Sequence, residues 1–399
     1  MTEVPLPTRL FTAMLGAYEL STVYLGVRLG CYAALAEDGP ANAAELAERC
    51  GIHPRYAREW LEQQAVAGFL AVDDSAAGAS SPVSGSAPGS ASASARVYAL
   101  PKEHVDLADP EGPLAAMALM HAGIGSVTAR LVDAYRSGTG LAYGEYGADV
   151  RAGQAGFVRE TYRTLLPAVL RAAVSAMAAS TSTITSASAT TRTTSAAAPE
   201  PAGSASEWVP DRIIDFGCGA GWSSLALAAA FPDVRIEGLD SDSACIEQAR
   251  TNAAAAGVAH RVSFEVCDAA EPVVQPASAG GGERYDVALF CDVLHDLARP
   301  VEALVSARKL LTERGFAVVV DEPASDIFTA PGDQLQRGLY VASVLHCLPV
   351  GMAEQPSAAT GALMRPDTLR GYAREAGFAR VQELPAHDGS GMRAYLLAV

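Results

Sequence analysis

Hydrophobic residues recur with helical spacing in the first part of the chain. Apolar side chains three and four positions apart run through residues 19–37 and, after a proline, through 43–50 and 54–70. This spacing puts apolar groups on one face of each helix, so it predicts three helices. Gly51 lies in the turn before the last helix, and Pro54 opens that helix, which is a helix-turn-helix pattern.

Two short extended runs follow this pair of helices. They are FLAVDD at residues 69–74 and RVYALP at 96–101. Runs of this kind on either side of an insertion at 75–95 suit the two strands of a wing with an enlarged tip. We therefore predict a winged-helix or dimerisation domain over residues 1–110.

Ser, Ala and Thr dominate residues 75–95 and 178–207, and a smaller stretch at 273–283 is similar. These segments hold few large apolar side chains, so burial cannot offset the entropy lost on ordering them. We predict that all three are disordered insertions. Residues 111–177 form a predicted helical bridge, with its clearest helix at 161–177.

From residue 208 to 399 the pattern changes to strands and helices in alternation. Each of five apolar runs is followed by a polar or helical segment: RIIDFG, RIEGLD, VSFEVCD, DVALFCD and FAVVVDE. Alternating βα units predict an α/β fold with a parallel sheet covered by helices on both faces. The chain closes with a helix and two extended runs, ARVQELP and MRAYLLAV, which are close enough in sequence to pair only antiparallel.

Composition narrows the classes of function. The chain has 399 residues, is 50% hydrophobic and carries a net charge of −16, which disfavours binding to nucleic acid or to an anionic membrane. Residues 1–75 hold ten acidic against five basic side chains, so the helix-turn-helix lacks the basic face of a DNA reader.

The seven cysteines stand singly, without a CxxC pair, which suits a reducing compartment. The N-terminal residues lack the pattern of a signal peptide, and no run of about 18 apolar residues is uninterrupted. The sequence thus predicts a soluble cytoplasmic protein without a membrane partner.

A glycine-rich turn follows the first strand of the α/β region. In IIDFGCGAGW (213–222), Gly217, Gly219 and Gly221 lie between a strand and a helix, where a ligand can approach the main chain. Dinucleotide-binding turns have a third glycine where this chain has Trp222, whose bulk disfavours a pyrophosphate. A nicotinamide cofactor and a purely structural turn are the weaker alternatives.

Acidic residues end the next two strands. Asp240, at the tip of RIEGLD, is placed to bind ribose hydroxyls, or alternatively to cap the following helix, for which Asp242 is better placed. After the third strand, the Asp268 carboxylate and the Ala269 amide could recognise adenine. Polar groups at the carboxyl ends of successive strands indicate a ligand site there.

These motifs together resemble the class I S-adenosylmethionine (SAM)-dependent methyltransferases. The match rests on DFGCGAG at 215–221, Asp240, CDAA at 267–270, YDVALFCDVLHDL at 285–297 and KLLTERGFAVVVDE at 309–322. The resemblance implies a Rossmann-like seven-stranded methyltransferase sheet with SAM as cofactor. It also implies that the glycine turn lies against the methionine part of SAM, with Asp215 nearby, while Asp240 holds the ribose and Asp268 the adenine.

More narrowly, the chain resembles small-molecule O-methyltransferases and a group of bacterial winged-helix methyltransferases of unassigned substrate. The motifs that carry this likeness are GLAYGEYG at 140–147 and CLPVGMAEQPSAATGALMRPDTL at 347–369. The resemblance implies a small-molecule methyl acceptor and a homodimer. A SAM-binding or metabolite-binding winged-helix regulator and a protein or RNA methyltransferase are the alternatives.

The segment LHDL, residues 294–297, holds the candidate catalytic group. The resemblance puts His295 where O-methyltransferases have a base, and histidine titrates near neutral pH, so His295 is either a general base or a packing and positioning residue. Asp292 could orient His295 or contact the methionine end of SAM, and Asp296 is expected to cap a helix. Candidate pocket residues are Tyr143, Tyr146, Tyr340, His346 and Met352. No Asp, Glu or His grouping has metal-ligand spacing, so no metal is expected.

Overall fold

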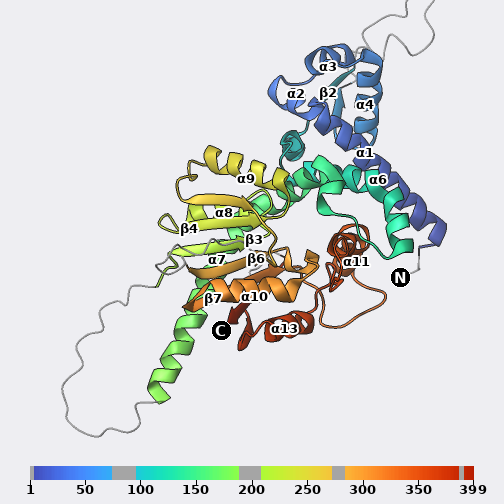
Figure 1. Cartoon of the computed structure of the whole chain (residues 1–399). Helices are drawn as coiled ribbons and strands as arrows, with labels where there is room; N and C mark the ends of the chain where they lie inside the picture. The colour runs from blue at the N-terminus through green and yellow to red at the C-terminus, as the bar shows by residue number, and fades with distance from the viewer. Residues whose placement is uncertain (1–3, 74–95, 188–207, 272–283, 386–390) are drawn as a thin grey trace, which may run out of the picture. The chain divides into compact units, whose positions relative to one another are not determined.

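The computed structural model describes residues 4–73, 96–187, 208–271, 284–385 and 391–399. Within these residues the chain forms two compact units (Figure 1). The first takes in Met1–Ser126 and Tyr146–Phe157, and the second Val127–Glu145 and Val158–Val399. The predicted insertions at 75–95 and 273–283 lie outside the described residues.

The first unit begins with four helices. They are α1 (Leu6–Arg28), α2 (Cys31–Glu37), α3 (Ala43–Cys50) and α4 (Pro54–Val66). Asn42 and Glu45 form a reciprocal capping box at the start of α3, and Gly51 ends that helix with a φ of +64°, which glycine adopts without strain. Pro54 occupies the first turn of α4, where its missing N–H costs nothing. The predicted helix-turn-helix is therefore confirmed.

A two-stranded antiparallel wing follows the helices. Strand β1 (Ala71–Asp73) pairs with β2 (Val97–Ala99), and Ala41 bridges to Tyr98. A short 3-10 helix, η2 (Lys102–Ala108), comes next. The core beneath these elements is closed by Tyr32 and Trp60, whose rings meet edge to face at 5.1 Å.

The expected helical bridge consists of α6 (Pro113–Ser137), η3 (Tyr143–Tyr146) and α7 (Gly147–Ala187). The two compact units divide it, since each unit takes part of α6 and of α7. Helix α7 also continues past residue 177, so residues 178–187 are helical where the sequence predicted the start of a disordered insertion. Extending an existing helix adds a hydrogen bond per residue without a new nucleation cost, so a helix can continue into a segment whose composition alone predicts disorder. Residues 188–207 lie outside the described part.

The second unit contains a seven-stranded sheet in the order β5-β4-β3-β6-β7-β9-β8. Its strands are β3 (Arg212–Phe216), β4 (Arg235–Asp240), β5 (Val262–Val266), β6 (Tyr285–Cys291), β7 (Leu311–Asp321), β8 (Arg380–Glu383) and β9 (Arg393–Ala398). The first five are parallel, and β9 pairs antiparallel with both β7 and β8. The predicted Rossmann-like seven-stranded sheet is confirmed.

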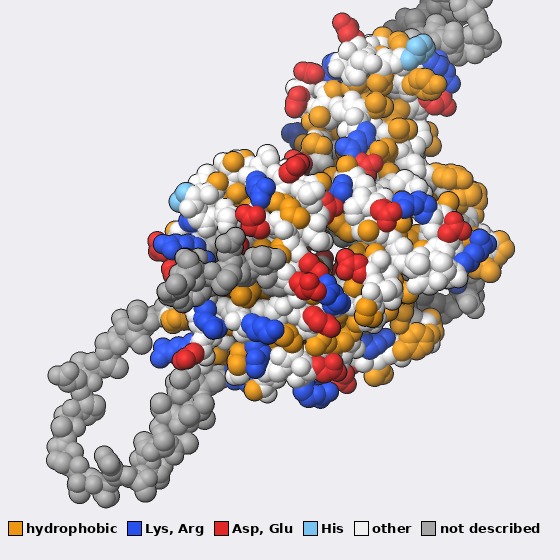
Figure 2. Space-filling view, in the orientation of Figure 1, with side chains coloured by type: hydrophobic (Ala, Val, Ile, Leu, Met, Phe, Trp, Pro, Cys, Tyr) orange, Lys and Arg blue, Asp and Glu red, His pale blue; other side chains and the backbone are white. Residues whose placement is uncertain are grey.

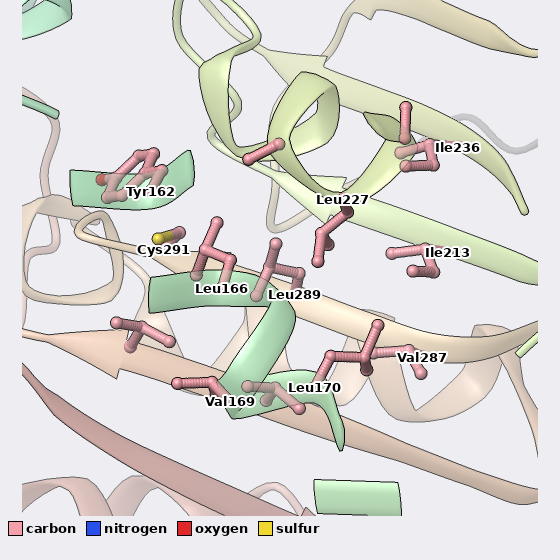
Figure 3. Close-up of a cluster of buried hydrophobic side chains, with 14 of the residues drawn as sticks. Tyr162, Leu166, Val169, Leu170, Ile213, Leu227, Ile236, Val287, Leu289 and Cys291 are labelled. Carbon is pink, nitrogen blue, oxygen red and sulfur yellow. The ribbon is translucent and has the colours of Figure 1, made fainter. Parts of the chain in front are cut away.

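Helices cover both faces of this sheet (Figure 1). Besides its parts of α6 and α7, the helices of this unit among the described residues are α8 (Trp222–Ala230), α9 (Ser243–Ala255), α10 (Pro300–Leu310), α11 (Gln334–Ala342), α12 (Leu348–Gly351) and α13 (Pro366–Glu375), with a π-helical turn η5 (Ser343–Cys347) and a 3-10 turn η4 (Leu294–Asp296). One core joins α7, α8 and α9 to the sheet, and a second joins α10 and α13 to the opposite face. In the first core, Leu166 and Leu170 of α7 lie over Leu289 of β6 (Figure 3).

Two helices of the described residues are long and apolar enough to cross a membrane by length and composition. They are α1 (Leu6–Arg28) and α6 (Pro113–Ser137). Only 11% of the apolar window of α1 is buried, against 39% of that of α6. Core helices of soluble proteins pass the same test, and α1 leaves most of its apolar window exposed.

Candidate functional site

The glycine turn joins the end of β3 to α8 and is held by its own amides. The Gly217 and Cys218 amides donate to the Leu239 carbonyl at 2.7 and 2.9 Å, and the Gly219 amide donates to Asp240 Oδ2 at 2.8 Å. A phosphate would need such amides free. Their internal use disfavours a pyrophosphate and fits a ligand whose charged centre is a cation.

The three glycines of the turn differ in what surrounds them. A Cβ on Gly217 would lie 2.2 Å from Val293 Cγ2, and one on Gly221 would lie 2.8 Å from Phe264 Cζ. Gly219, with a φ of +53°, has no atom within 4 Å of that position. The turn is thus packed tightly on both sides and open at its centre, which leaves room for a ligand against the main chain.

Asp215 lies beneath the turn and is fully buried. Its Oδ2 accepts hydrogen bonds from the hydroxyls of Ser223 and Ser224 at 2.6 and 2.7 Å. Burial raises the pKa of Asp215 to about 6, against the opposing effect of these two serines. Asp215 therefore fixes the first turn of α8.

Asp240 ends β4 at the same edge of the sheet. One carboxylate oxygen accepts from the Gly219 amide and the other from the Asp242 amide, both at 2.8 Å. Asp242 itself caps α9 through the Ala244 and Cys245 amides. The capping role is therefore confirmed for Asp242, and Asp240 is a pre-positioned carboxylate beside the turn.

Asp268 and Ala269 follow β5. Asp268 is exposed; it accepts from the Ala270 amide at 2.8 Å and forms an ion pair with Arg299. Arg299 also pairs with Glu271 at 2.6 Å. Arg299 was not singled out in the sequence, because it comes from the segment after η4, on a different strand–helix unit.

The LHDL segment follows strand β6, which lies beside β3 in the sheet, so it begins next to the glycine turn. The Asp292 amide still donates to the Val320 carbonyl of β7 at 2.7 Å, and its φ of +54° then departs from the extended backbone of β6. His295 lies in η4 and is 2% exposed. Its Nδ1 is 2.7 Å from Asp321 Oδ1, and its Nε2 is 3.3 Å from Asp296 Oδ1.

Asp321 was missed in the sequence, although a signal was present. It ends β7, the strand beside β6, and so reaches the same edge by the rule already used for Asp240. Asp296 was expected to cap a helix, and this is wrong: it lies in η4, and residue 299 occupies the N-cap position of α10. The 3-10 turn carries Asp296 back toward the imidazole instead.

Negative charge dominates around His295. Although burial alone would lower the pKa of His295, the charges of Asp321 and Asp296 raise it well above its ordinary value. Burial raises the pKa of Asp292 to about 6 and that of Glu322 to about 8. The surrounding carboxyl groups thus favour the charged form of the imidazole.

The candidate pocket residues separate into two groups. Tyr143 and His346 lie together, with ring centroids 5.8 Å apart, whereas Tyr340 is at the surface and contacts Phe328 edge to face. Met352 directly follows α12. Tyr146 belongs to the other compact unit and is 2% exposed.

Two groups of side chains have the proximity needed to hold a metal ion. They are Asp292 with His295 and Asp321, and His295 with Asp296 and Cys347, their ligand atoms lying within 4.8 Å of one another. These sets come from different strands, so spacing along the sequence did not reveal them. The expectation of no metal stays a prediction.

Comparison with known proteins identifies two domains in the chain. Residues 210–337 match a methyltransferase domain family, and residues 19–84 match the Rv2258c-like winged HTH domain. A tRNA1(Val) (adenine(37)-N6)-methyltransferase of Porphyromonas gingivalis is 34% identical over 88 residues, which are 22% of this chain and 32% of that protein. A ubiquinone biosynthesis O-methyltransferase of Roseobacter denitrificans is 28% identical over 166 residues, 42% of this chain and 59% of that protein. The chain thus matches less than two thirds of the length of these relatives.

Solved structures resemble the chain over nearly its whole length. Human N-acetylserotonin methyltransferase in complex with SAM has a TM-score of 0.65 at 15% identity and covers 100% of this chain and 99% of its own. At that identity the likeness concerns the fold, with the same two-domain layout. The two domain matches identify residues 210–337 as a methyltransferase domain and residues 19–84 as an Rv2258c-like winged HTH domain, in the layout that a SAM-bound structure shares.

Proposed function

We propose that this methyltransferase transfers the methyl group of SAM to a hydroxyl of a small-molecule acceptor, with His295 as general base. The observation that carries the proposal is the pairing of His295 Nδ1 with Asp321 Oδ1 at 2.7 Å, at the strand edge that also presents Asp240 and the glycine turn. The likeness to an O-methyltransferase of ubiquinone biosynthesis supports oxygen as the acceptor atom.

The proposed cofactor residues lie at three strand ends, and each set binds a different part of SAM. Asp240 would bind the ribose, Asp268 with the Ala269 amide the adenine, and the turn of Gly217, Gly219 and Gly221 the methionine part. When bound, SAM supplies a methyl group on a positively charged sulfur and leaves as S-adenosylhomocysteine (SAH). Asp292 lies beside the turn through Val293, which packs against Gly217, and its carboxylate favours a cationic centre there.

His295 would accept the acceptor's hydroxyl proton at Nε2 as the oxygen bonds to the methyl carbon. Asp321 would hold the ring through Nδ1 and stabilise the imidazolium that forms. Only a neutral imidazole accepts a proton, so the acid limb of turnover should lie above about pH 6.5, the ordinary pKa of histidine. A flat pH profile would instead favour a charged, purely positioning His295. No metal is part of this mechanism.

The acceptor class is tested by incubating the protein with methyl-labelled SAM and a library of phenols, alcohols and amines. Mass spectrometry of the products places the methyl group on oxygen or nitrogen. We expect transfer to hydroxyl compounds. Labelling of amines alone would overturn the choice of oxygen, and labelling of RNA or protein alone would overturn the small-molecule acceptor.

Nucleic acid is not part of the proposed function. On α4, Arg55 pairs with Glu59 and Arg58 with Glu62, so the basic groups of the helix-turn-helix are neutralised within the helix. The face drawn in Figure 2 likewise intersperses basic with acidic side chains. A gel-shift titration at physiological salt should show no sequence-selective DNA binding, and such binding would favour a regulator instead.

We further propose a homodimer in the cytoplasm, formed through α1. This helix exposes a series of large apolar side chains: Leu6, Leu10, Phe11, Met14, Leu15, Tyr18 and Leu25. A second copy of the chain offers a matching apolar face. The seven cysteines, all free, agree with a reducing compartment.

Light scattering during gel filtration tests the dimer. Wild type should have twice the monomer mass, Phe11→Glu should be a monomer, and Val105→Glu, which changes an exposed residue elsewhere in the same unit, should remain dimeric. A monomeric wild type would contradict the dimer. Flotation of wild type with lipid vesicles would assign α1 to a membrane instead.

A further inference from the structure

Tyr143 comes from a segment that is fixed to the second unit by its main chain. Gly140 packs so closely on α12 and the residues after it that a Cβ would lie 2.1 Å from the Ala353 nitrogen and 2.2 Å from the Pro349 carbonyl oxygen. The Leu141 amide then donates to that same carbonyl at 2.9 Å. Only glycine allows this contact, so the backbone leading to Tyr143 has a defined position.

The turn after this contact is closed by a charged pair. Glu145 accepts a hydrogen bond from the Ala142 amide at 2.8 Å and forms an ion pair with Arg130 of α6. Tyr143 stands between the two anchors, Leu141 on one side and Glu145 on the other. Its side chain is therefore presented from a short, doubly anchored loop.

One end of the Tyr143 side chain reaches the cofactor residues. Burial, followed by the charges of Cys245 and Asp240, raises the pKa of Tyr143 well above its ordinary value, which puts its hydroxyl beside the Cys245 side chain. Cys245 is in the first turn of α9, directly after Asp242. The hydroxyl thus lies at the strand end that carries Asp240, the proposed ribose ligand.

The ring of Tyr143 faces the other side of the site. It meets His346 edge to face, with centroids 5.8 Å apart and planes at 74°. His346 is 2% exposed and sits in the π-helical turn η5, next to Cys347, whose Sγ lies within 4.8 Å of a ring nitrogen of His295. Single π-helical turns are frequent at functional sites. Burial lowers the pKa of His346, so this imidazole is neutral at pH 7.

We propose that Tyr143 is a positioning residue shared by two subsites, its hydroxyl at the ribose edge beside Asp240 and Cys245 and its ring against His346 on the acceptor side. The proposal rests on the proposed function, because it takes the ribose and acceptor subsites from there. It adds that the hydroxyl and the ring have separable effects. The hydroxyl serves cofactor binding, and the ring orders the imidazole that lines the acceptor subsite.

Two variants separate these effects. Tyr143→Phe keeps the ring and removes the hydroxyl, so SAH should bind roughly 3- to 10-fold more weakly, the usual effect of one hydrogen bond. The KM for the acceptor should not change. Tyr143→Leu removes the ring as well, so it should weaken SAH binding similarly and in addition raise the acceptor KM. Tyr56→Phe, an exposed tyrosine of the other unit, is the matched control and should bind SAH as wild type does.

Calorimetry with SAH gives the dissociation constants, and melting temperatures without ligand show whether each variant folds. Unchanged SAH affinity in a folded Tyr143→Phe would overturn the hydroxyl assignment, and an equal acceptor KM in both variants would overturn the ring assignment. If Tyr143→Leu does not fold, Tyr143→Trp retains an aromatic ring and should keep the acceptor KM close to that of wild type, whereas Tyr143→Met, which has no ring, should raise it. A wild type that binds no SAH would defeat the proposed function itself, which is a different outcome from an unaffected Tyr143→Phe.

Discussion

The two halves of the sheet's carboxyl edge use acidic side chains in opposite ways. At the end of β4, both oxygens of Asp240 accept backbone hydrogen bonds at 2.8 Å, so the carboxylate is fixed before any ligand arrives. At the ends of β6 and β7, Asp292 Oδ1 and Asp321 Oδ2 are buried and have no hydrogen-bond partner among the described residues. The Asp240 carboxylate is therefore satisfied by the protein itself, whereas one oxygen of Asp292 and one of Asp321 are not.

This difference follows from what each half would do. A ribose is neutral and needs an oriented acceptor, which backbone amides provide. Methyl transfer involves a positively charged sulfur and the transfer of a proton. Carboxylate oxygens that do not already accept hydrogen bonds can stabilise both. A buried carboxyl oxygen without a partner is costly, and burial accordingly raises the pKa of Asp292 to about 6.

The largest expected effect concerns the reacting end. His295→Gln should reduce turnover roughly 100- to 10,000-fold, the usual contribution of a general base, because glutamine cannot take the proton. Its affinity for SAH should stay within about threefold of wild type. Single-turnover transfer of labelled methyl, with SAH binding measured on the same preparation, separates the two. Unchanged turnover would remove His295 as base.

The next effect concerns the cofactor end. Asp240→Ala removes the acceptor that fixes Gly219 and the proposed ribose ligand, and hydrogen bonds to charged groups contribute about 1.5–3 kcal/mol each. We expect SAH to bind about 100-fold more weakly, as measured by calorimetry. Asp242→Ala, which removes only the cap of α9, is the control and should have a much smaller effect. Equal losses in both variants would mean that Asp240 acts through the helix rather than the ligand.

Asp321→Asn tests how the two carboxyl groups around His295 act. Without the Asp321 charge the raised pKa of His295 should fall, so the acid limb of kcat/KM should move to lower pH. The maximal rate should drop about 10-fold, because the imidazolium loses a stabilising charge. The measurement is a pH profile of kcat/KM for both proteins. A limb that stays in place would show that the limb belongs to another group.

The smallest expected effect is on stability. Because the folded-state pKa of Asp215 is raised to about 6, above its unfolded value, its stabilising contribution is present at low pH and is lost as pH rises through 6. In Asp215→Asn, the melting temperature should therefore fall less between pH 5 and pH 7 than in wild type, by about 2–4 °C. Parallel melting curves over that range would contradict a buried, shifted Asp215.

The residues that could be placed at the sheet edge from the sequence share one property. Their position follows from the local order of strands and turns. The turn from Gly217 to Gly221, Asp240 and Asp268 each follow a strand, and the end of a parallel strand has only one edge to reach. Asp321 could have been found by the same rule. Arg299 could not, because its partner Asp268 belongs to a different strand–helix unit.

Contacts between distant segments escaped prediction for a related reason. The meeting of Tyr143 with His346 depends on how the loop before α7 packs on α12, which no periodicity in the sequence encodes. The role of Asp296 was mistaken because a 3-10 turn, rather than the start of α10, follows β6. Helical extension of α7 into a Ser- and Thr-rich segment likewise depends on the helix that precedes it.

Binding of SAH to the purified full-length protein tests the central claim most directly. Calorimetric titration should give saturable one-site binding to wild type, essentially unchanged in His295→Gln and about 100-fold weaker in Asp240→Ala. Absence of binding to folded wild type, or equal weakening in both variants, would contradict a sheet edge divided into a cofactor half and a reacting half.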